Sequence, residues 1–216
     1  MHATRKLWTW LAVICARSFA ALGWVGTEIY VSAPPIPKAV TSSKGDTVFA
    51  EGSVQRGQEA WLAAGGQQLG SVWGHGSYLA PDWSADWLHR EAVALREIRA
   101  QQRHGTAYAN LQAGQQAALD AELKAEMRRN THDAATNVIT LSAERAEAVR
   151  GVAKHYADLF GDEATLAGLR EQYAMLPGTL KLAEDREALS AFFFWSAWSA
   201  TTDRPGETGL SYTSNW

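Results

Sequence analysis

Cysteine is almost absent from this sequence. The 216 residues include one cysteine, Cys15, which lies in an apolar N-terminal segment. One cysteine cannot form an intrachain disulfide, a cysteine-pair zinc site or the C-x-x-C-H attachment of haem c. The cellular compartment must therefore be inferred from targeting signals.

A concentrated positive charge is also lacking. The formal net charge is −3, and basic residues alternate with acidic ones from Glu91 onward. Proteins that bind nucleic acids typically carry a basic patch or stripe, so no nucleic-acid partner is expected. The length allows one domain with a substantial core, with or without a membrane anchor.

Catalytic and cofactor-binding motifs are missing as well. The six histidines are scattered, without H-x-x-x-H or H-E-x-x-H spacing. Ser71 and Ser77 have glycine neighbours but lack the G-x-S-x-G pattern, and "GGQQLG" lacks the Lys-Ser/Thr pair of a phosphate loop. Asp82, Asp86 and Glu91 are predicted at first-turn positions of a helix, where carboxylates complement its dipole. The motifs thus predict no catalytic and no cofactor-binding residue in this chain.

The N-terminus carries the one long apolar run. Arg5 and Lys6 precede a mostly apolar segment from Leu7 to Val31. This length suffices to cross a bilayer, which takes about 20 residues. Arg17 opposes insertion by about 2.5–3.5 kcal/mol, and the apolar residues of the segment offset that cost.

Residues 1–32 are therefore predicted to be a transmembrane anchor. Basic residues before the helix predict a cytoplasmic N-terminus and an extracytoplasmic main domain. A cleaved secretory peptide is the alternative, because Val31, Ser32 and Ala33 have the spacing of a cleavage site. Pro34 would follow the cut and disfavours that alternative.

The remaining chain predicts a mostly α-helical extramembrane domain with little β structure. Ser142 and Asp162 are predicted to be helix N-caps, and Gly65 with Gly66 is predicted to end a helix. A short strand is expected at residues 47–50. The helices are expected at about residues 54–64, 81–104, 112–129, 143–160, 163–176 and 182–200.

Residues 60–91, "AWLAAGGQQLGSVWGHGSYLAPDWSADWLHRE", combine four tryptophans with five glycines. Aromatic residues at this density are typical of a domain core or of an interface with protein or lipid headgroups. The alternative is a docking face for a partner, with its geometry set by the glycines.

Three stretches resemble the N-terminal part of the quinol-dependent nitric oxide reductases. They are "EIYVSAPPIP", "GQEAWLAAGGQQLGSVWGHGSYLAPDWSADWLHRE" and "FFFWSAWSATTDRPGETGLSYTSNW". The resemblance extends from about Lys6 to Trp216. It implies a cytochrome-c-like extramembrane domain fused to a catalytic membrane domain of the haem–copper-oxidase type.

The resemblance also implies that this domain has lost its haem. Related cytochrome-dependent reductases have a cytochrome c subunit with the pattern C-x-x-C-H-T-x-x-G-E-G-A-Y-x-A-P. Its last part matches Gly74, Gly76, Tyr78, Ala80 and Pro81 of this chain. The same spacing places the two cysteine positions on Gly66 and Leu69, and the axial histidine position on Gly70.

The parent enzyme implied by the resemblance reduces two NO molecules to N2O with electrons from membrane quinol. Its cofactors are two b-type haems and a non-haem iron, whose ligands belong to later transmembrane helices. This chain has none of those ligands and is expected to be inactive alone. The implied location is the bacterial inner membrane, with the main domain in the periplasm and the lipid bilayer around the anchor.

In the cytochrome-dependent relatives, the glycine and tyrosine of the G-x-Y pattern help to bind calcium. The resemblance therefore implies a calcium site at Gly76 and Tyr78, with oxygen ligands. Docking to the catalytic domain is expected from Trp73, Gly74, His75, Gly76, Ser77, Tyr78, Pro81, Trp83 and Trp87.

The expected organisation is an anchor at 1–32, a haem-free cytochrome-c-like domain at 33–200, and a connector at 201–216 leading to the catalytic domain. Two other hypotheses remain open. The chain could be a stand-alone, membrane-anchored interaction module of a respiratory complex. It could also be a soluble binder of b-type haem through His75 or His89.

Overall fold

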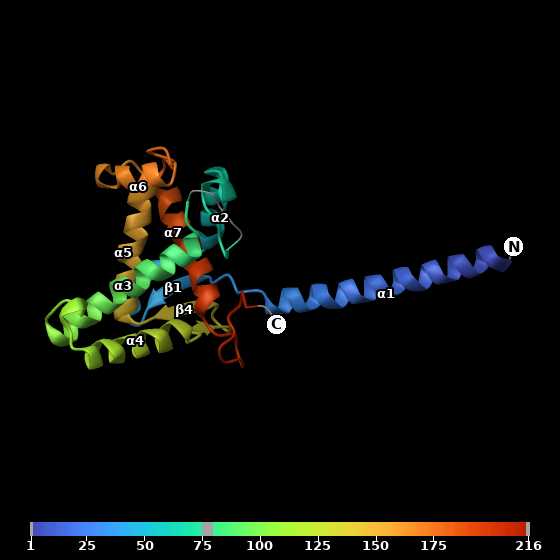
Figure 1. Cartoon of the computed structure of the whole chain (residues 1–216), viewed down its shortest axis with the longest axis horizontal. Helices are drawn as coiled ribbons and strands as arrows, with labels where there is room; N and C mark the ends of the chain where they lie inside the picture. The colour runs from blue at the N-terminus through green and yellow to red at the C-terminus, as the bar shows by residue number, and fades with distance from the viewer. Residues whose placement is uncertain (1, 75–79, 215–216) are drawn as a thin grey trace. The chain divides into compact units, whose positions relative to one another are not determined.

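The computed structural model describes residues 2–74 and 80–214. The chain forms two compact units, residues 1–34 and residues 35–216. The first unit consists mainly of α1 (His2–Ser32), and the second contains all the other elements (Figure 1). The predicted fold class is confirmed, since helices dominate and strands are short.

Helix α1 has the length and composition of a membrane span. Its segment Thr4–Ser32 is long and apolar enough to cross a bilayer. Leu7, Trp8, Phe19 and Trp24 are among its exposed apolar side chains. Exposed apolar surface on this scale is costly in water, so a lipid environment suits the helix.

A small sheet adjoins the helices of the second unit. It contains β1 (Ala39–Ser42), β2 (Thr47–Phe49), β3 (His132–Asp133) and β4 (Val138–Leu141), in the order β2-β1-β4-β3. Strands β1 and β4 pair in parallel, and the two outer pairs are antiparallel. Val40 and Ile139 lie opposite each other in this pairing, and both are buried in the core.

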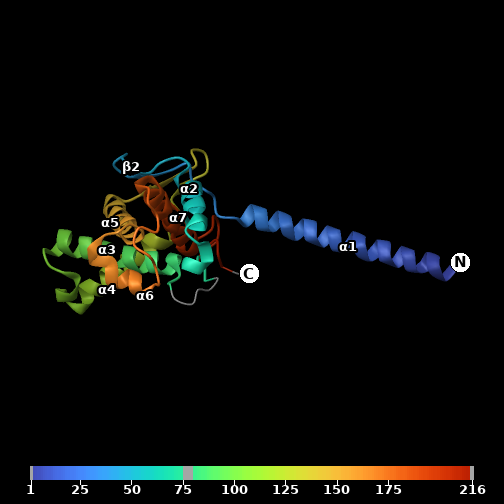
Figure 2. The same ribbon diagram turned by 90° about the horizontal axis from the view of Figure 1, so that it is seen from above.

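Helix α7 (Ala183–Thr201) is the central element of the second unit. Every residue from Ala188 to Ser199 is buried. A helix that is apolar on all sides needs neighbours on all sides. Helix α7 runs between α2 (Ser53–Ala63) and α5 (Ala143–Phe160) (Figures 1 and 2), and α3 (Trp83–His104) also packs against it.

The contact between α2 and α7 depends on Gly57. A Cβ atom at this position would lie 2.0 Å from the carbonyl oxygen of Ala188 and 2.7 Å from Cβ of Phe192. Only glycine allows two helix backbones to approach this closely. Trp61, one turn further along α2, packs against Phe192 with ring centroids 5.6 Å apart.

Helix α4 (Ala113–Arg128) lies beside α3 and contributes to a smaller core. Leu119 packs with Ala100 and Leu111, and Tyr108 covers this cluster. Three short 3-10 turns and one short helix complete the unit: η1 (Gly66–Leu69), η2 (Tyr108–Asn110), η3 (Ala164–Leu166) and α6 (Ala167–Gln172).

The two predicted N-caps have different outcomes. Ser142 caps α5, because its side chain accepts a hydrogen bond from the Arg145 backbone N–H. The prediction for Asp162 is wrong, because Glu163 caps the following turn and accepts from the Thr165 N–H. The helix predicted for residues 163–176 is accordingly divided into η3 and α6.

The C-terminal residues 201–214 pack against other parts of the second unit. Asp203 N–H donates to the Arg128 carbonyl at 2.8 Å, and Tyr212 N–H donates to the Ser199 carbonyl at 3.1 Å. The Tyr212 ring lies 5.5 Å from the Trp198 ring. This segment therefore belongs to the same compact unit as the helices, and a connecting role for it stays a prediction.

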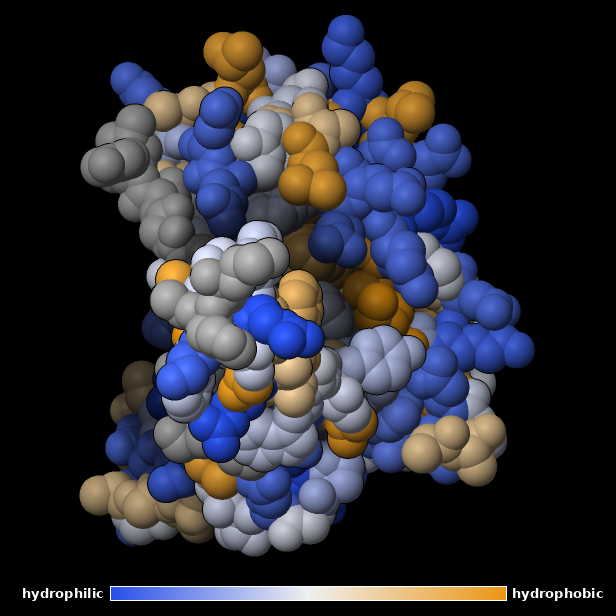
Figure 3. Space-filling view, turned by 90° about the vertical axis from the view of Figure 1, so that its right-hand side faces the viewer, coloured by the Kyte–Doolittle hydropathy of each residue, from blue (hydrophilic) through white to orange (hydrophobic). Residues whose placement is uncertain are grey.

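The surface of the molecule in Figure 3 is mostly hydrophilic, with hydrophobic residues scattered between the polar ones. The exposed large apolar residues of the second unit include Leu62, Leu176 and Leu182. Isolated apolar residues of this kind are normal on a protein surface.

Candidate functional site

The loop between α2 and α3, residues 65–82, is here called the tryptophan loop. Its described residues are 65–74 and 80–82. Gly65 and Gly70 have φ values of 121° and 127°, which side chains with a Cβ atom rarely adopt. The loop closes on itself in a bridge between Ser71 and Asp82. Ser71 N–H donates to the Pro81 carbonyl, and Trp83 N–H donates to the Ser71 carbonyl at 2.8 Å.

Asp82 closes the loop and starts α3. Its Oδ2 atom accepts from the Ser71 hydroxyl at 2.9 Å and from Gly74 N–H at 2.5 Å. Its Oδ1 atom accepts from Ala85 N–H at 2.9 Å, which is the bond of an N-cap. One carboxylate thus satisfies three donors and joins the loop to the helix.

Trp73 ties the loop to α7. Its indole Nε1 donates to the Ser196 carbonyl at 2.8 Å, and its backbone N–H donates to the Ser84 hydroxyl at 3.1 Å. Its ring lies 5.4 Å from the ring of Trp195. Trp73 has a φ of 56°, in the left-handed region, which is uncommon for a residue with a side chain. The loop therefore bends sharply next to an anchored tryptophan.

Gly70 lies directly against the indole of Trp83. A Cβ atom at Gly70 would be 2.2 Å from Nε1 of Trp83 and 2.5 Å from its Cε2. The carbonyl oxygen of Pro81 would be 2.9 Å away. No side chain fits at position 70, and this is the position that the sequence pattern places at the axial histidine of a haem c.

The Trp83 indole sits in an aromatic core. It is fully buried and stacks on Phe193 with centroids 5.3 Å apart and planes 15° apart. Three further rings meet it edge-on, at centroid distances of 5.4–5.9 Å. These geometries are favourable for aromatic pairs. The three rings belong to Tyr156, Phe160 and Tyr173.

Trp87 extends this core by one turn of α3. It is fully buried, and its ring stacks on Tyr156 at 5.3 Å. Its Nε1 donates to Glu91 Oε2 at 2.8 Å, and Glu91 Oε1 accepts from Nε of Arg145 at 2.6 Å. Glu91 is 1% exposed. The expectation of a first-turn role for Glu91 is wrong, because it forms a buried ion pair in the middle of α3.

Asp86 links α3 to α5 at the edge of the aromatic core. It accepts from the Tyr156 hydroxyl at 2.6 Å and from Arg90 Nε at 2.8 Å. Burial raises the pKa of Tyr156 well above its usual value, and the Asp86 carboxylate adds to this effect. Burial and nearby Arg90 lower the pKa of His155. Asp86 does occupy the first turn of α3, as predicted.

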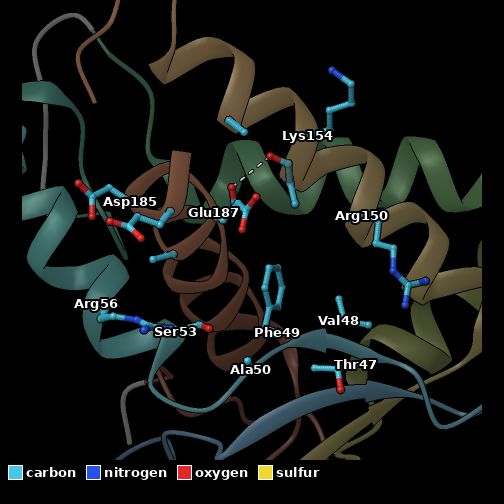
Figure 4. A pocket seen from close by; sticks show the side chains of 15 residues that line it. Thr47, Val48, Phe49, Ala50, Ser53, Arg56, Arg150, Lys154, Asp185 and Glu187 are labelled. Carbon is cyan, nitrogen blue, oxygen red and sulfur yellow. Dashed lines mark hydrogen bonds between the residues drawn. The ribbon is translucent and has the colours of Figure 1, made fainter. Parts of the chain in front are cut away.

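An open cleft of about 730 Å³ lies where β2, α2, α5 and α7 meet (Figure 4). Phe49 and Ala188 supply apolar lining. Arg56, Arg150 and Lys154 lie around the cleft, together with acidic residues from the start of α7. Carboxylates in a first turn complement the helix dipole, so this arrangement has a structural explanation.

The residues expected to dock a partner differ in accessibility. Trp73 and Pro81 are half-buried and Gly74 is exposed. For Trp83 and Trp87 the expectation needs correction, because both side chains are fully buried in the aromatic core. The other four, His75, Gly76, Ser77 and Tyr78, lie outside the described residues, and so does the calcium site expected at Gly76 and Tyr78.

The described residues do not fit a covalent haem. The position of the axial histidine has no room for a side chain, and the space beside it is filled by Trp83. Across residues 2–74 and 80–214, histidine, cysteine and carboxylate side chains do not gather in groups of three or more that could hold a metal ion. His89, the other histidine considered for haem, is exposed on α3.

A comparison with known protein families identifies a family for most of the chain. The model of the cytochrome c-like domain of the nitric oxide reductase protein NorB matches residues 37–216, which is nearly all of the second unit. The chain belongs to this family. A search of the curated proteins finds no match.

The family assignment confirms the resemblance seen in the sequence. The chain combines an N-terminal apolar helix, long enough for a membrane anchor, with the NorB cytochrome c-like domain. It is thereby related to an oxidoreductase. Within this cytochrome c-like domain, the tryptophan loop occupies the place between the first and second helices of the second unit.

Sequence reasoning missed three features of the site. Gly57 was not identified as the helix contact, although a glycine within a helical pattern is a signal of close packing. Trp195 was placed on the last helix but not paired with Trp73. Arg145 gave no signal at all, since its partner Glu91 lies 54 residues earlier.

Proposed function

We propose that this chain is the N-terminal part of a quinol-dependent nitric oxide reductase and that its role there is structural. In this proposal the anchor and the cytochrome c-like domain cap a catalytic membrane domain, which reduces two NO molecules to N2O. The two b-type haems and the non-haem iron belong to that catalytic domain. The chain alone is inactive.

The contact between Gly70 and Trp83 carries this proposal. A cytochrome c donor needs a haem in the extramembrane domain to receive its electrons. Here the indole of Trp83 lies against the backbone at the haem-ligand position, and it is locked in place by four aromatic rings. Electrons then have to reach the catalytic domain by another route, and a quinol dissolved in the membrane offers one.

The anchor defines the location in this proposal. Helix α1 crosses the bacterial inner membrane, with Arg5 and Lys6 on the cytoplasmic side, as the positive-inside rule expects. The cytochrome c-like domain is then periplasmic. In this location the domain lies on the same side of the membrane as the periplasmic face of the catalytic domain.

The tryptophan loop is the proposed contact with the catalytic domain. Trp73, Gly74 and Pro81 are among its described accessible residues. In this proposal residues 75–78 also take part in the contact, and Gly76 with Tyr78 contributes oxygen ligands to calcium there. The buried Trp83 holds the loop at Gly70 and Ser71.

The test is to express the chain together with the catalytic domain and to measure quinol-driven NO consumption and co-purification. The double variant His75→Ala/Tyr78→Ala is expected to lower both, by about tenfold or more, since a few central residues dominate most interfaces. Leu176→Ala is the matched control, because Leu176 is an exposed apolar residue outside the tryptophan loop. It should leave both readouts unchanged.

Two outcomes would contradict the proposal. Full activity and co-purification of the double variant would show that the tryptophan loop is not the contact. Co-purification with a different respiratory complex, without any effect on NO consumption, would instead identify a stand-alone interaction module.

A further inference from the structure

We propose that the second unit has a binding site for a tetrahedral oxyanion, such as phosphate, at the N-terminal end of α5. A cavity of about 340 Å³ lies there, between α4, β4 and α5. The proposal does not depend on the role in nitric oxide reduction. The residues that carry it all line this cavity: Glu126, Arg129, Thr131, Thr140, Ser142 and Arg145.

Arg145 is the first observation that points to a ligand. Its side chain is 2% exposed, and its Nε donates to Glu91. Its Nη2 atom is buried and has no hydrogen-bond partner among the described residues. A buried guanidinium N–H without an acceptor is unfavourable, and native structures rarely leave one unpaired. An acceptor in the cavity lined by Arg145 would satisfy this donor.

Thr131 supplies a second unpaired group in the same cavity. Its hydroxyl is buried and, within the described part of the chain, lacks a hydrogen-bond partner. Thr140 adds another hydroxyl to the lining. A hydroxyl donates readily to an anionic oxygen, so the two threonines suit an oxyanion next to Arg145.

The charges around the cavity also favour an anion. Arg129 is exposed at the cavity and forms no ion pair with a described carboxylate. Ser142 is the N-cap of α5, an 18-residue helix, so the positive end of the helix dipole is adjacent. Arg129 and the helix end therefore place positive charge beside the cavity, while Glu144 in the first turn of α5 pairs with Arg99 and Arg103.

Glu126 is the one carboxylate among the residues that line the cavity. It is engaged by other groups, since it accepts from Arg99 Nη2 and from the Ser142 hydroxyl at 2.6 Å. Arg99 is buried and pairs with both Glu126 and Glu144. Glu126 is thus held by Arg99 and by the Ser142 hydroxyl, and within the described residues it does not pair with Arg129.

A tetrahedral oxyanion matches these donors better than a halide does. It presents several acceptor oxygens in different directions, and guanidinium groups bind phosphate through paired N–H donors. The same chemistry is present in free phosphate and in a phosphate ester. Inorganic phosphate and glycerol 3-phosphate are therefore the two probes that separate these sources.

The test uses the full chain in detergent, titrated with each probe against sodium chloride of equal ionic strength. Calorimetry gives the Kd, and the thermal midpoint should rise with phosphate by mass action. Thr131→Val keeps the shape of the side chain and removes the hydroxyl, and it should raise the Kd about tenfold. Arg129→Ala should raise it about two- to fivefold, because this residue is exposed.

Arg56→Ala is the matched control, since Arg56 is an exposed arginine of α2 that does not line the cavity. It should leave the Kd unchanged. Tighter binding of inorganic phosphate would assign a free anion, and tighter binding of glycerol 3-phosphate would assign a phosphate ester. Absence of binding, or equal weakening by Arg56→Ala and Thr131→Val, would overturn the proposal.

Discussion

Replacing Gly70 by alanine tests how tightly the haem-ligand position is packed. The new Cβ would lie 2.2 Å from Nε1 of Trp83, well inside van der Waals contact. Trp83 cannot move away easily, because Phe193 stacks on it and three other rings surround it. Overpacking of this kind costs about 1–3 kcal/mol. The φ of 127° at Gly70 adds backbone strain of about 1–3 kcal/mol for alanine.

The expected loss in the free energy of unfolding is therefore about 2–6 kcal/mol. Urea unfolding followed by tryptophan fluorescence measures this loss directly. The thermal midpoint should fall by about 4 °C or more, at about 2–4 °C per kcal/mol for a domain of this size.

Two further variants separate the cost of overpacking from the cost of backbone strain. Gly45 has a φ of 89°, and no atom lies within 4 Å of a Cβ atom built there. Gly45→Ala should therefore lower the free energy of unfolding only by the backbone strain, which is about 1–2 kcal/mol. In a Gly70→Ala/Trp83→Phe double variant the smaller ring relieves the collision, so the two losses should be less than additive, by about 0.5–3 kcal/mol. If Gly70→Ala costs no more than Gly45→Ala, Trp83 does not block this position.

The remaining predictions concern packing, charge and pH. Gly57→Ala forces α2 away from Ala188 and should lower the free energy of unfolding by about 1–3 kcal/mol, measured by urea denaturation. Glu91→Gln leaves the buried Arg145 charge unpaired and should cost about 3–5 kcal/mol by the same measurement. Because the pKa of His155 is lowered in the folded chain, the unfolded chain protonates this histidine at a higher pH than the folded chain does. Stability should therefore be constant above about pH 7 and fall as the pH drops below the ordinary histidine pKa of 6.5. His155→Gln should flatten this part of the pH profile of the urea midpoint.

Each of these predictions has a control. Gly151→Ala, in α5 with open space around the new Cβ, should stabilise by about 0.5–1 kcal/mol, and a loss as large as that of Gly57→Ala would show that the α2–α7 contact is not the cause. Replacing Glu91 and Arg145 together by methionine should recover most of the loss of Glu91→Gln. An unchanged pH profile in His155→Gln would assign the acid sensitivity to other groups.

The helices could be predicted from local sequence signals. Apolar spacing and the Ser142 cap located α5, and the density of aromatic residues located α7. The sheet was largely missed, because β1 and β4 pair in parallel across about a hundred residues and each has only four residues. Short strands give little periodic signal, and a long-range pairing gives none locally.

The candidate site could be predicted in part. The cluster of tryptophans and glycines in residues 60–91 indicated an aromatic core or interface, and Trp83 and Trp87 do lie in the core. The sequence could not separate buried from accessible tryptophans, since Trp73 and Trp83 lie ten residues apart in the same tryptophan-rich stretch. Their difference arises from α7, where Ser196 binds Trp73 and Phe193 covers Trp83.

A difference spectrum of the assembled enzyme, reduced minus oxidised, tests the central claim most directly. The chain is purified together with its catalytic domain, and a quinol is added as the reductant. The account predicts the absorption bands of b-type haem and no c-type band, because the ligand position at Gly70 is closed by Trp83. A c-type band, or reduction by cytochrome c but not by quinol, would contradict it.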